Sequence, residues 1–137
     1  MTMKNLFNTD SNWAPVILRV ALGSVVFAHG AQKTLGWFDG YGFDGTMQYF
    51  TQSVGLPWIV SFSVILLESI GSLALITGLA TRLVAIAFTG LAIGIMFTTH
   101  TQHGFFMNWS GKQAGEGFEF FLFWIAMAVT LVITGAG

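Results

Sequence analysis

The chain contains no cysteine and very few charged side chains. Without cysteine it can form no disulfide bond, no cysteine-held iron–sulfur cluster and no thiolate zinc site. Only 8% of its residues are charged, whereas soluble domains average about 25%. Five lysine and arginine residues and a net charge of -1 cannot supply a surface that follows nucleic-acid phosphates. The composition therefore excludes a nucleic-acid-binding protein and argues against a soluble domain.

Apolar residues, 54% of the 137, gather in four long stretches. These stretches cover about residues 13–35, 57–77, 82–99 and 118–134. A membrane-spanning helix needs about 20 mostly apolar residues, and in lipid the backbone must satisfy its own hydrogen bonds. The sequence therefore predicts an all-α protein, a single transmembrane domain over residues 1–137 that forms an up-and-down four-helix bundle. The first stretch is predicted to be a permanent helix, because no cleavage pattern of a signal peptide follows it.

The connections between the stretches differ greatly in length. Residues 77–81 form a tight turn, whereas residues 36–56 and 100–117 form long loops that are rich in glycine and aromatic residues. Four spans place both long loops on one side and both termini on the other. The terminal side carries Lys4 and Arg82, with Arg19 just inside the membrane, and the long-loop side carries Lys33 and Lys112. Because basic residues favour the cytoplasm, we expect both termini to lie in the cytoplasm.

Two local patterns concern packing. Residues 46–54 are predicted to form a short interfacial helix that turns Met47 and Phe50 towards the membrane. Gly90 and Gly94 form a small-xxx-small motif, which permits close approach of two helices. The default interpretation of this motif is packing within the bundle, and a homodimer face is the alternative.

A polar stripe ends the first apolar stretch. His29, Gln32 and Lys33 stand at positions i, i+3 and i+4, so they share one helix face. Arg19 lies about 80° from His29 around the same helix, at 100° per residue. Polar groups at membrane depth usually face a bundle interior or a cavity. The alternatives are that Lys33 extends to the interface and that a neighbouring helix satisfies His29.

Glu68 is the one acidic residue in the second apolar stretch and lies close to mid-membrane. A carboxylate in hydrocarbon becomes protonated or finds a cation, and the possible cations are Arg19, His29 and Lys33. One interpretation is a structural Arg19–Glu68 pair that joins the first two helices. The other is a proton-accepting or hydrogen-bonding group beside a bound ligand.

The long-loop side carries further polar and aromatic residues. His100, His103, Glu116 and Glu119 gather near the ends of the last two helices, and Glu119 also suits a helix N-terminus. His100 and His103 with Met107 are a weak copper pattern, so no metal site is predicted. The aromatic residues are expected to form an interfacial belt or to wall a flat ring. They are Trp37, Phe38, Phe105, Phe106 and Trp109.

Residues 29–46, HGAQKTLGWFDGYGFDGT, closely resemble the first-helix and loop signature of the DoxX family of small bacterial membrane proteins. The resemblance continues through Gly55-Leu56-Pro57, Glu68 with Gly71, residues 78–82, His100, Gly104-Phe105-Phe106 and residues 115–119. One small departure is Asp39, where relatives often carry glycine. The resemblance implies a four-helix protein of the bacterial inner membrane. Its relatives are linked to quinol oxidation and thiosulfate:quinone oxidoreduction, to redox-stress complexes, and to quinone or catechol resistance.

The leading hypothesis is a redox-associated subunit that binds a quinone or quinol ring near the outer leaflet. His29, Lys33 and Glu68 would carry the chemistry, because quinol oxidation releases protons and needs a base. Further ligand contacts or proton relays are expected from Gln32, Arg19, Trp37, His100, Phe106 and Glu119. No intrinsic cofactor is predicted, so electrons would pass to a partner subunit or a soluble acceptor. The alternatives are a non-catalytic scaffold subunit of a larger complex or homo-oligomer, and a small transporter of hydrophobic solutes.

Overall fold

The computed structural model describes residues 12–100, 104–107 and 117–136, without the side chains of residues 99 and 100. This part of the chain is helical, with short π-helical segments (η) that continue three of the α-helices. The elements are α2 (Trp13–Thr34), α3 (Gly42–Gln48), η1 (Tyr49–Val54), α4 (Trp58–Leu66), η2 (Leu67–Gly71), α5 (Ser72–Thr77), α6 (Thr81–Ile95), η3 (Met96–His100) and α7 (Glu119–Thr134). The predicted all-α fold is confirmed.

Three continuous helical runs are long and apolar enough to cross a membrane: Trp13–Thr34, Trp58–Thr77 and Thr81–Thr98. The fourth, Glu119–Thr134, is apolar but shorter, and it packs along α6. Large apolar side chains are exposed on all of these helices, among them Ile17, Val25, Ile59, Ile70, Leu83, Phe123 and Ile133. Hydrocarbon surfaces that face outward in this way suit lipid rather than water. The chain is therefore a multi-pass membrane protein.

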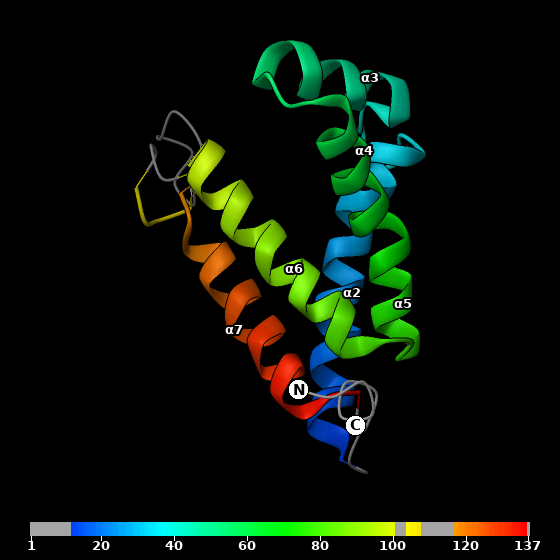
Figure 1. Cartoon of the computed structure of the whole chain (residues 1–137), viewed down its shortest axis with the longest axis vertical. Coiled ribbons are helices and arrows are strands. Elements are labelled where there is room, and N and C mark those ends of the chain that lie inside the picture. Colours follow the sequence, from blue (N-terminus) through cyan, green and yellow to red (C-terminus); the bar gives the residue numbers. More distant parts are fainter. Residues whose placement is uncertain (1–11, 101–103, 108–116, 137) are drawn as a thin grey trace.

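The helices form two pairs (Figure 1). α2 packs against the α4–α5 run, and α6 packs against α7. The pairs meet near the start of α2, the α5–α6 turn and the end of α7, and they diverge towards α3. Both long connections therefore leave from one end of the bundle and the tight turn lies at the other, as predicted. We call these the loop end and the terminal end.

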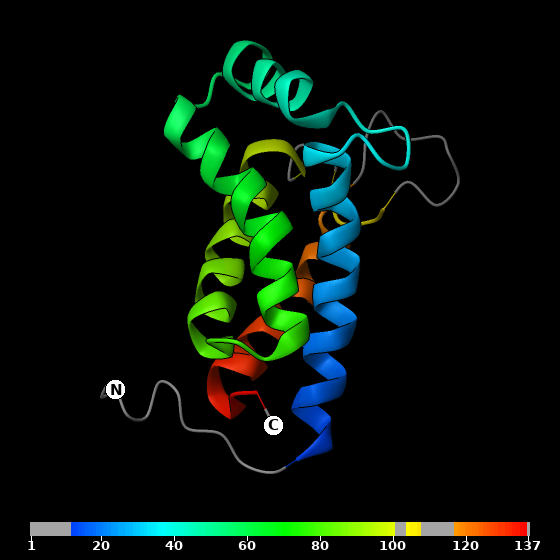
Figure 2. The same ribbon diagram turned by 90° about the vertical axis from the view of Figure 1, so that its right-hand side faces the viewer.

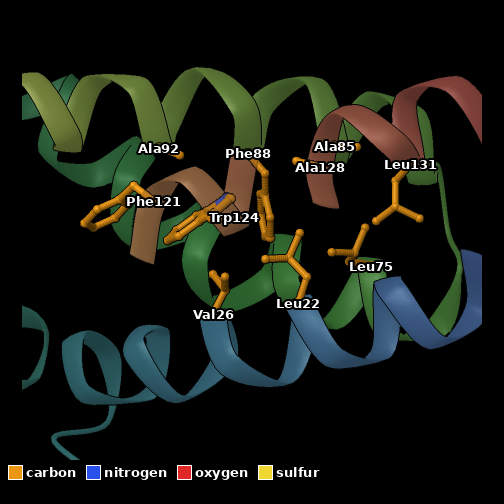
Figure 3. Packing of buried hydrophobic residues seen from close by; sticks show 10 residues of the cluster. All are labelled: Leu22, Val26, Leu75, Ala85, Phe88, Ala92, Phe121, Trp124, Ala128 and Leu131. Carbon is orange, nitrogen blue, oxygen red and sulfur yellow. The ribbon is translucent and has the colours of Figure 1, made fainter. Parts of the chain in front are cut away.

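The core lies where the two pairs meet (Figure 3). It is a cluster of buried apolar side chains from α2, α5, α6 and α7: Leu22, Val26, Leu75, Ala85, Phe88, Ala92, Phe121, Trp124, Ala128 and Leu131. The large rings of Phe88 and Trp124 fill its centre, with centroids 5.8 Å apart. The pairs diverge from this cluster towards the loop end. The core therefore holds the two pairs together on the side away from that end.

Two arginines fasten the terminal end. Arg19 donates to the backbone carbonyls of Ile76 and, at 2.8 Å, Ala136. Arg82 donates to the carbonyl of Val132 at 3.0 Å. The last carbonyls of a helix lack partners within the helix, and a cation there also complements the helix dipole. Each guanidinium therefore caps the end of a neighbouring helix.

Two glycines allow α2 to approach the second span closely. A Cβ on Gly30 would lie 2.7 Å from the backbone nitrogen of Ser69 and closer still to the carbonyl oxygen of Glu68. A Cβ on Gly23 would lie 3.0 Å from the carbonyl oxygen of Ser72. The motif predicted for packing behaves differently, since a Cβ on Gly90 or Gly94 would meet nothing within 4 Å. Packing of Gly90 and Gly94 within the bundle was therefore a wrong prediction.

The predicted interfacial helix exists and is longer than expected. α3 and η1 together cover residues 42–54 and lie across the loop end of the bundle (Figure 2). Met47 is only 7% exposed, so the expectation that it faces the membrane is wrong. α3 packs on α2 and α4, and this contact turns Met47 towards the bundle.

Backbone hydrogen bonds join two segments of the second long connection. Three backbone hydrogen bonds of 2.8–3.2 Å join residues 104–106 to residues 117–119. Gly117 is needed at this crossing, because a Cβ there would lie 2.8 Å from the carbonyl carbon of Phe105. These bonds therefore hold residues 104–106 and residues 117–119 next to each other at the loop end.

Candidate functional site

A cavity of about 500 Å³ lies at the loop end. All four spans contribute to its wall, and η1 and the residues that follow it cover it. The polar residues among its lining include His29, Lys33, Glu68 and Thr98. The rest of the lining is chiefly aromatic and aliphatic. A space of this size falls within the range of small-molecule pockets, about 300–1,000 Å³.

Lys33 and Glu68 form an ion pair across the first two spans. Lys33 Nζ lies 2.6 Å from Glu68 Oε2, and the two side chains are 21% and 3% exposed. Lys33 Nζ also donates to the backbone carbonyl of His29 at 3.4 Å. Lys33, one of the three predicted partners, is therefore the cation that Glu68 finds. The alternative Arg19–Glu68 pair was wrong, because Arg19 caps helix ends at the terminal end.

A π-helical turn presents Glu68 to Lys33. Glu68 lies in η2, where the regular α-helix of the second span is interrupted. Ser72 Oγ donates to the carbonyl of Glu68 at 2.6 Å, and Ser69 Oγ donates to the carbonyl of Gly30 at 3.3 Å. Such turns occur often at functional sites. The sequence analysis did not anticipate the turn, although serine hydroxyls at 69 and 72 suit the disturbed carbonyls of such a segment.

His29 lines the cavity. Its side chain is exposed within the chain, and its ring centroid lies 6.2 Å from that of Phe120. Among the residues that the structure describes, the imidazole has no hydrogen-bond partner. The expectation that a neighbouring helix satisfies it is therefore not met within these residues.

The aromatic wall of the cavity comes from the last span. Phe120, Phe121 and Trp124 of α7 line the cavity together with Tyr49 and Phe50 of η1. Trp124 is 2% exposed, and its indole Nε1 has no hydrogen-bond partner among the described residues. A buried N–H without an acceptor is uncommon, and this one lies behind the ring surface that lines the cavity.

The sequence analysis placed the aromatic wall in the loops instead. Trp37 and Phe106 are 51% and 63% exposed, and neither lines the cavity. The sequence feature that could have identified the observed wall is the spacing of Phe120, Phe121 and Trp124. The first and last stand at i and i+4, so they share one helix face.

Gln32 and Glu119 hold loops rather than line the cavity. Gln32 Nε2 donates to the carbonyl of Phe38 at 3.3 Å, and Gly40 packs against the backbone of Gln32. Glu119 Oε1 accepts from the backbone nitrogen of Met107 at 2.9 Å. Both residues therefore fix the chain around the cavity, and the direct ligand contacts predicted for them are not part of this arrangement.

The remaining residues predicted to act at the loop end cannot be placed in the structure. The side chain of His100 and all of His103, Trp109, Lys112 and Glu116 lie outside the described residues. Within the described ranges, no three histidine, aspartate or glutamate side chains gather in a way that could hold a metal ion.

Residues 14–101 match the DoxX family. The chain belongs to the DoxX family. The match extends from α2 to the end of η3 and so includes His29, Lys33 and Glu68. The aromatic wall on α7 lies beyond the matched residues of this DoxX protein.

One relative is a Bacillus subtilis (strain 168) protein named "Putative oxidoreductase CatD". It is 34% identical over 93 residues, which cover 68% of this chain and 64% of that protein. The DoxX chain thus spans less than two thirds of the length of this relative. No solved structure matches the chain.

Proposed function

We propose that this DoxX protein binds a quinone or quinol ring in the cavity at the loop end. One observation carries the proposal: Lys33, Glu68 and His29 line a space of about 500 Å³ whose other walls are largely apolar and aromatic. Aromatic walls suit the faces of a flat ring, and a few polar groups at defined points suit the oxygens at its edge. The name of the relative adds support for redox chemistry.

The three polar side chains have distinct roles in the proposal. The Lys33 ammonium donates to one ring oxygen, and the Glu68 carboxylate holds that ammonium in place from 2.6 Å away. Oxidation of the quinol releases two protons and two electrons. The proton of the oxygen beside Lys33 passes to the Glu68 carboxylate, and His29 accepts the proton of the second oxygen and passes it to water. The electrons pass to an acceptor on a partner subunit or in solution.

The surroundings of the site follow from the same proposal. The protein lies in the bacterial inner membrane, and its termini face the cytoplasm, as the distribution of Lys4 and Arg82 favours. The loop end and the cavity then face outward, near the outer leaflet. Protons from a quinol would leave on that side.

The test is retention of quinone through purification in a mild detergent. We expect extracted wild-type protein to carry quinone, and His29→Ala and Glu68→Gln to lose most of it. Gln32→Ala is the matched control, because Gln32 lies on the same face of α2 but holds a loop instead of lining the cavity. Size-exclusion chromatography reports whether each variant stays folded. A wild-type protein free of quinone, or equal retention in all variants, would refute the proposal.

A second candidate is a scaffold subunit. It is favoured by exposed aromatic side chains at the loop end, among them Trp37 and Phe38, since aromatic residues are enriched in protein interfaces. This function predicts that a partner chain co-purifies with wild-type protein and is lost from a Trp37→Ala, Phe38→Ala variant. Quinone retention would not change in that variant.

A further inference from the structure

A second apolar space lies beside the cavity, on the outer surface between α4 and α6. It measures about 250 Å³, and Val60, Val64, Leu67, Ala87 and Leu91 are in its wall. The hydroxyl of Ser63, which also lines it, donates to the carbonyl of Ile59 at 2.7 Å. The groove therefore offers a ligand hydrocarbon contacts and no free side-chain donor.

This groove adjoins the cavity. Val64 lines both spaces, so its side chain stands between them. In Figure 1, α4 and α6 belong to different helix pairs and diverge towards the loop end. A hydrocarbon chain attached to a ligand in the cavity would have to pass only Val64 to reach the groove between these two helices.

The route along the bundle axis is covered. Tyr49, Phe50 and Val54 of η1, followed by Leu56, line the cavity on its loop side, and Figure 2 shows η1 and α3 lying across that end. These side chains cover part of the cavity on the side that faces water, whereas the α4–α6 groove faces the lipid. The bilayer is therefore the nearer source of an apolar ligand.

We infer that the ligand of the cavity is a ring with a long hydrocarbon tail, and that the tail lies in the α4–α6 groove. This inference rests on the proposed function and adds the class of ligand: a quinone dissolved in the bilayer, in place of a small water-soluble ring. The ring sits beside Lys33 and Glu68, and the tail passes Val64 into the groove.

The test compares two probes in nanodiscs of neutral phospholipid. One is 2-methyl-1,4-naphthoquinone without a tail, and the other is the same ring with several isoprene units. Binding is read from the quenching of Trp124 fluorescence, taken as the difference from a Trp124→Phe protein. Ala87→Phe fills the groove from an exposed position, and Ala126→Phe is the control on an exposed position of α7.

We expect Ala87→Phe to weaken binding of the tailed ring about tenfold, which corresponds to about 1.4 kcal/mol. Binding of the tailless ring should stay within about twofold, because the added phenyl group lies outside the cavity. Ala126→Phe should change neither value. Equal effects of Ala87→Phe on both probes, or no effect on either, would overturn the inference and leave the ring site intact. Failure of both probes to quench Trp124 in the wild type would instead reject the proposed function.

Discussion

Replacing Gly30 by alanine tests whether the close contact between α2 and η2 sets the Lys33–Glu68 pair. The new Cβ would lie 2.7 Å from the backbone nitrogen of Ser69, whereas ordinary contacts begin at 3.4 Å. Both obstacles, Ser69 N and the Glu68 carbonyl, are backbone atoms, so no side chain can move aside. The two helices must part by at least about 0.7 Å, because the Glu68 oxygen is nearer than Ser69 N, and such overpacking typically costs about 1–3 kcal/mol.

The same displacement lengthens the ion pair. From 2.6 Å, a stretch of about 0.7 Å weakens the attraction by about 1 kcal/mol at an effective dielectric constant of about 20. We therefore expect Gly30→Ala to lower the free energy of unfolding by about 2–4 kcal/mol. It should also reduce quinone retention, because Lys33 moves away from Glu68.

The assay is reversible unfolding in mixed detergent micelles, with quinone content measured on the same samples. Gly94→Ala is the matched control, since it adds the same methyl group to a helix at a point with nothing within 4 Å. Alanine is favoured over glycine in a helix by about 0.8–1 kcal/mol, so the control should be neutral or slightly stabilised. If Gly30→Ala behaves like Gly94→Ala in both measurements, the contact does not set the pair and this reasoning is wrong.

Two further predictions compare substitutions at the site with a substitution at the terminal end. Lys33→Met leaves the Glu68 carboxylate buried without a cation and should destabilise the protein by about 3–5 kcal/mol. The Lys33→Met, Glu68→Leu double variant should regain most of that stability while still losing quinone; a double variant no more stable than the single one would contradict this. Arg19→Met removes charged donors from helix carbonyls at the terminal end, each worth about 1.5–3 kcal/mol, and quinone retention should not change. Loss of quinone from a folded Arg19→Met protein would show that the two ends are coupled.

The sequence predicted the spans because their signal is local. Long apolar runs require helices in lipid, and the four predicted ranges agree closely with the observed ones. The position of Arg19 shows where this reasoning fails. The angle around α2 suggested a shared face with Lys33, but fourteen residues place the two about 21 Å apart along the axis. Axial level, which depends on how the helices pack, decided which cation meets Glu68.

The features of the site that were missed all depend on contacts between helices. Nothing in the sequence distinguishes Gly30 from the other glycines. Only the structure shows that the carbonyl of Glu68 lies against it. No clear sequence pattern predicts the π-helical turn of η2 within an apolar stretch. No pattern predicts the divergence of α4 from α6 either. The aromatic residues of α7 were visible in the sequence, but only the packing of α7 against α2 and α6 shows that they face the cavity.

The crossing of residues 104–106 with residues 117–119 has a practical consequence. Its backbone hydrogen bonds fix the distance between the two chain segments, so extra residues placed between positions 108 and 116 would exert no pull on α6 or α7. An epitope or a fluorescent reporter inserted there would therefore mark one side of the membrane while the helices keep their places.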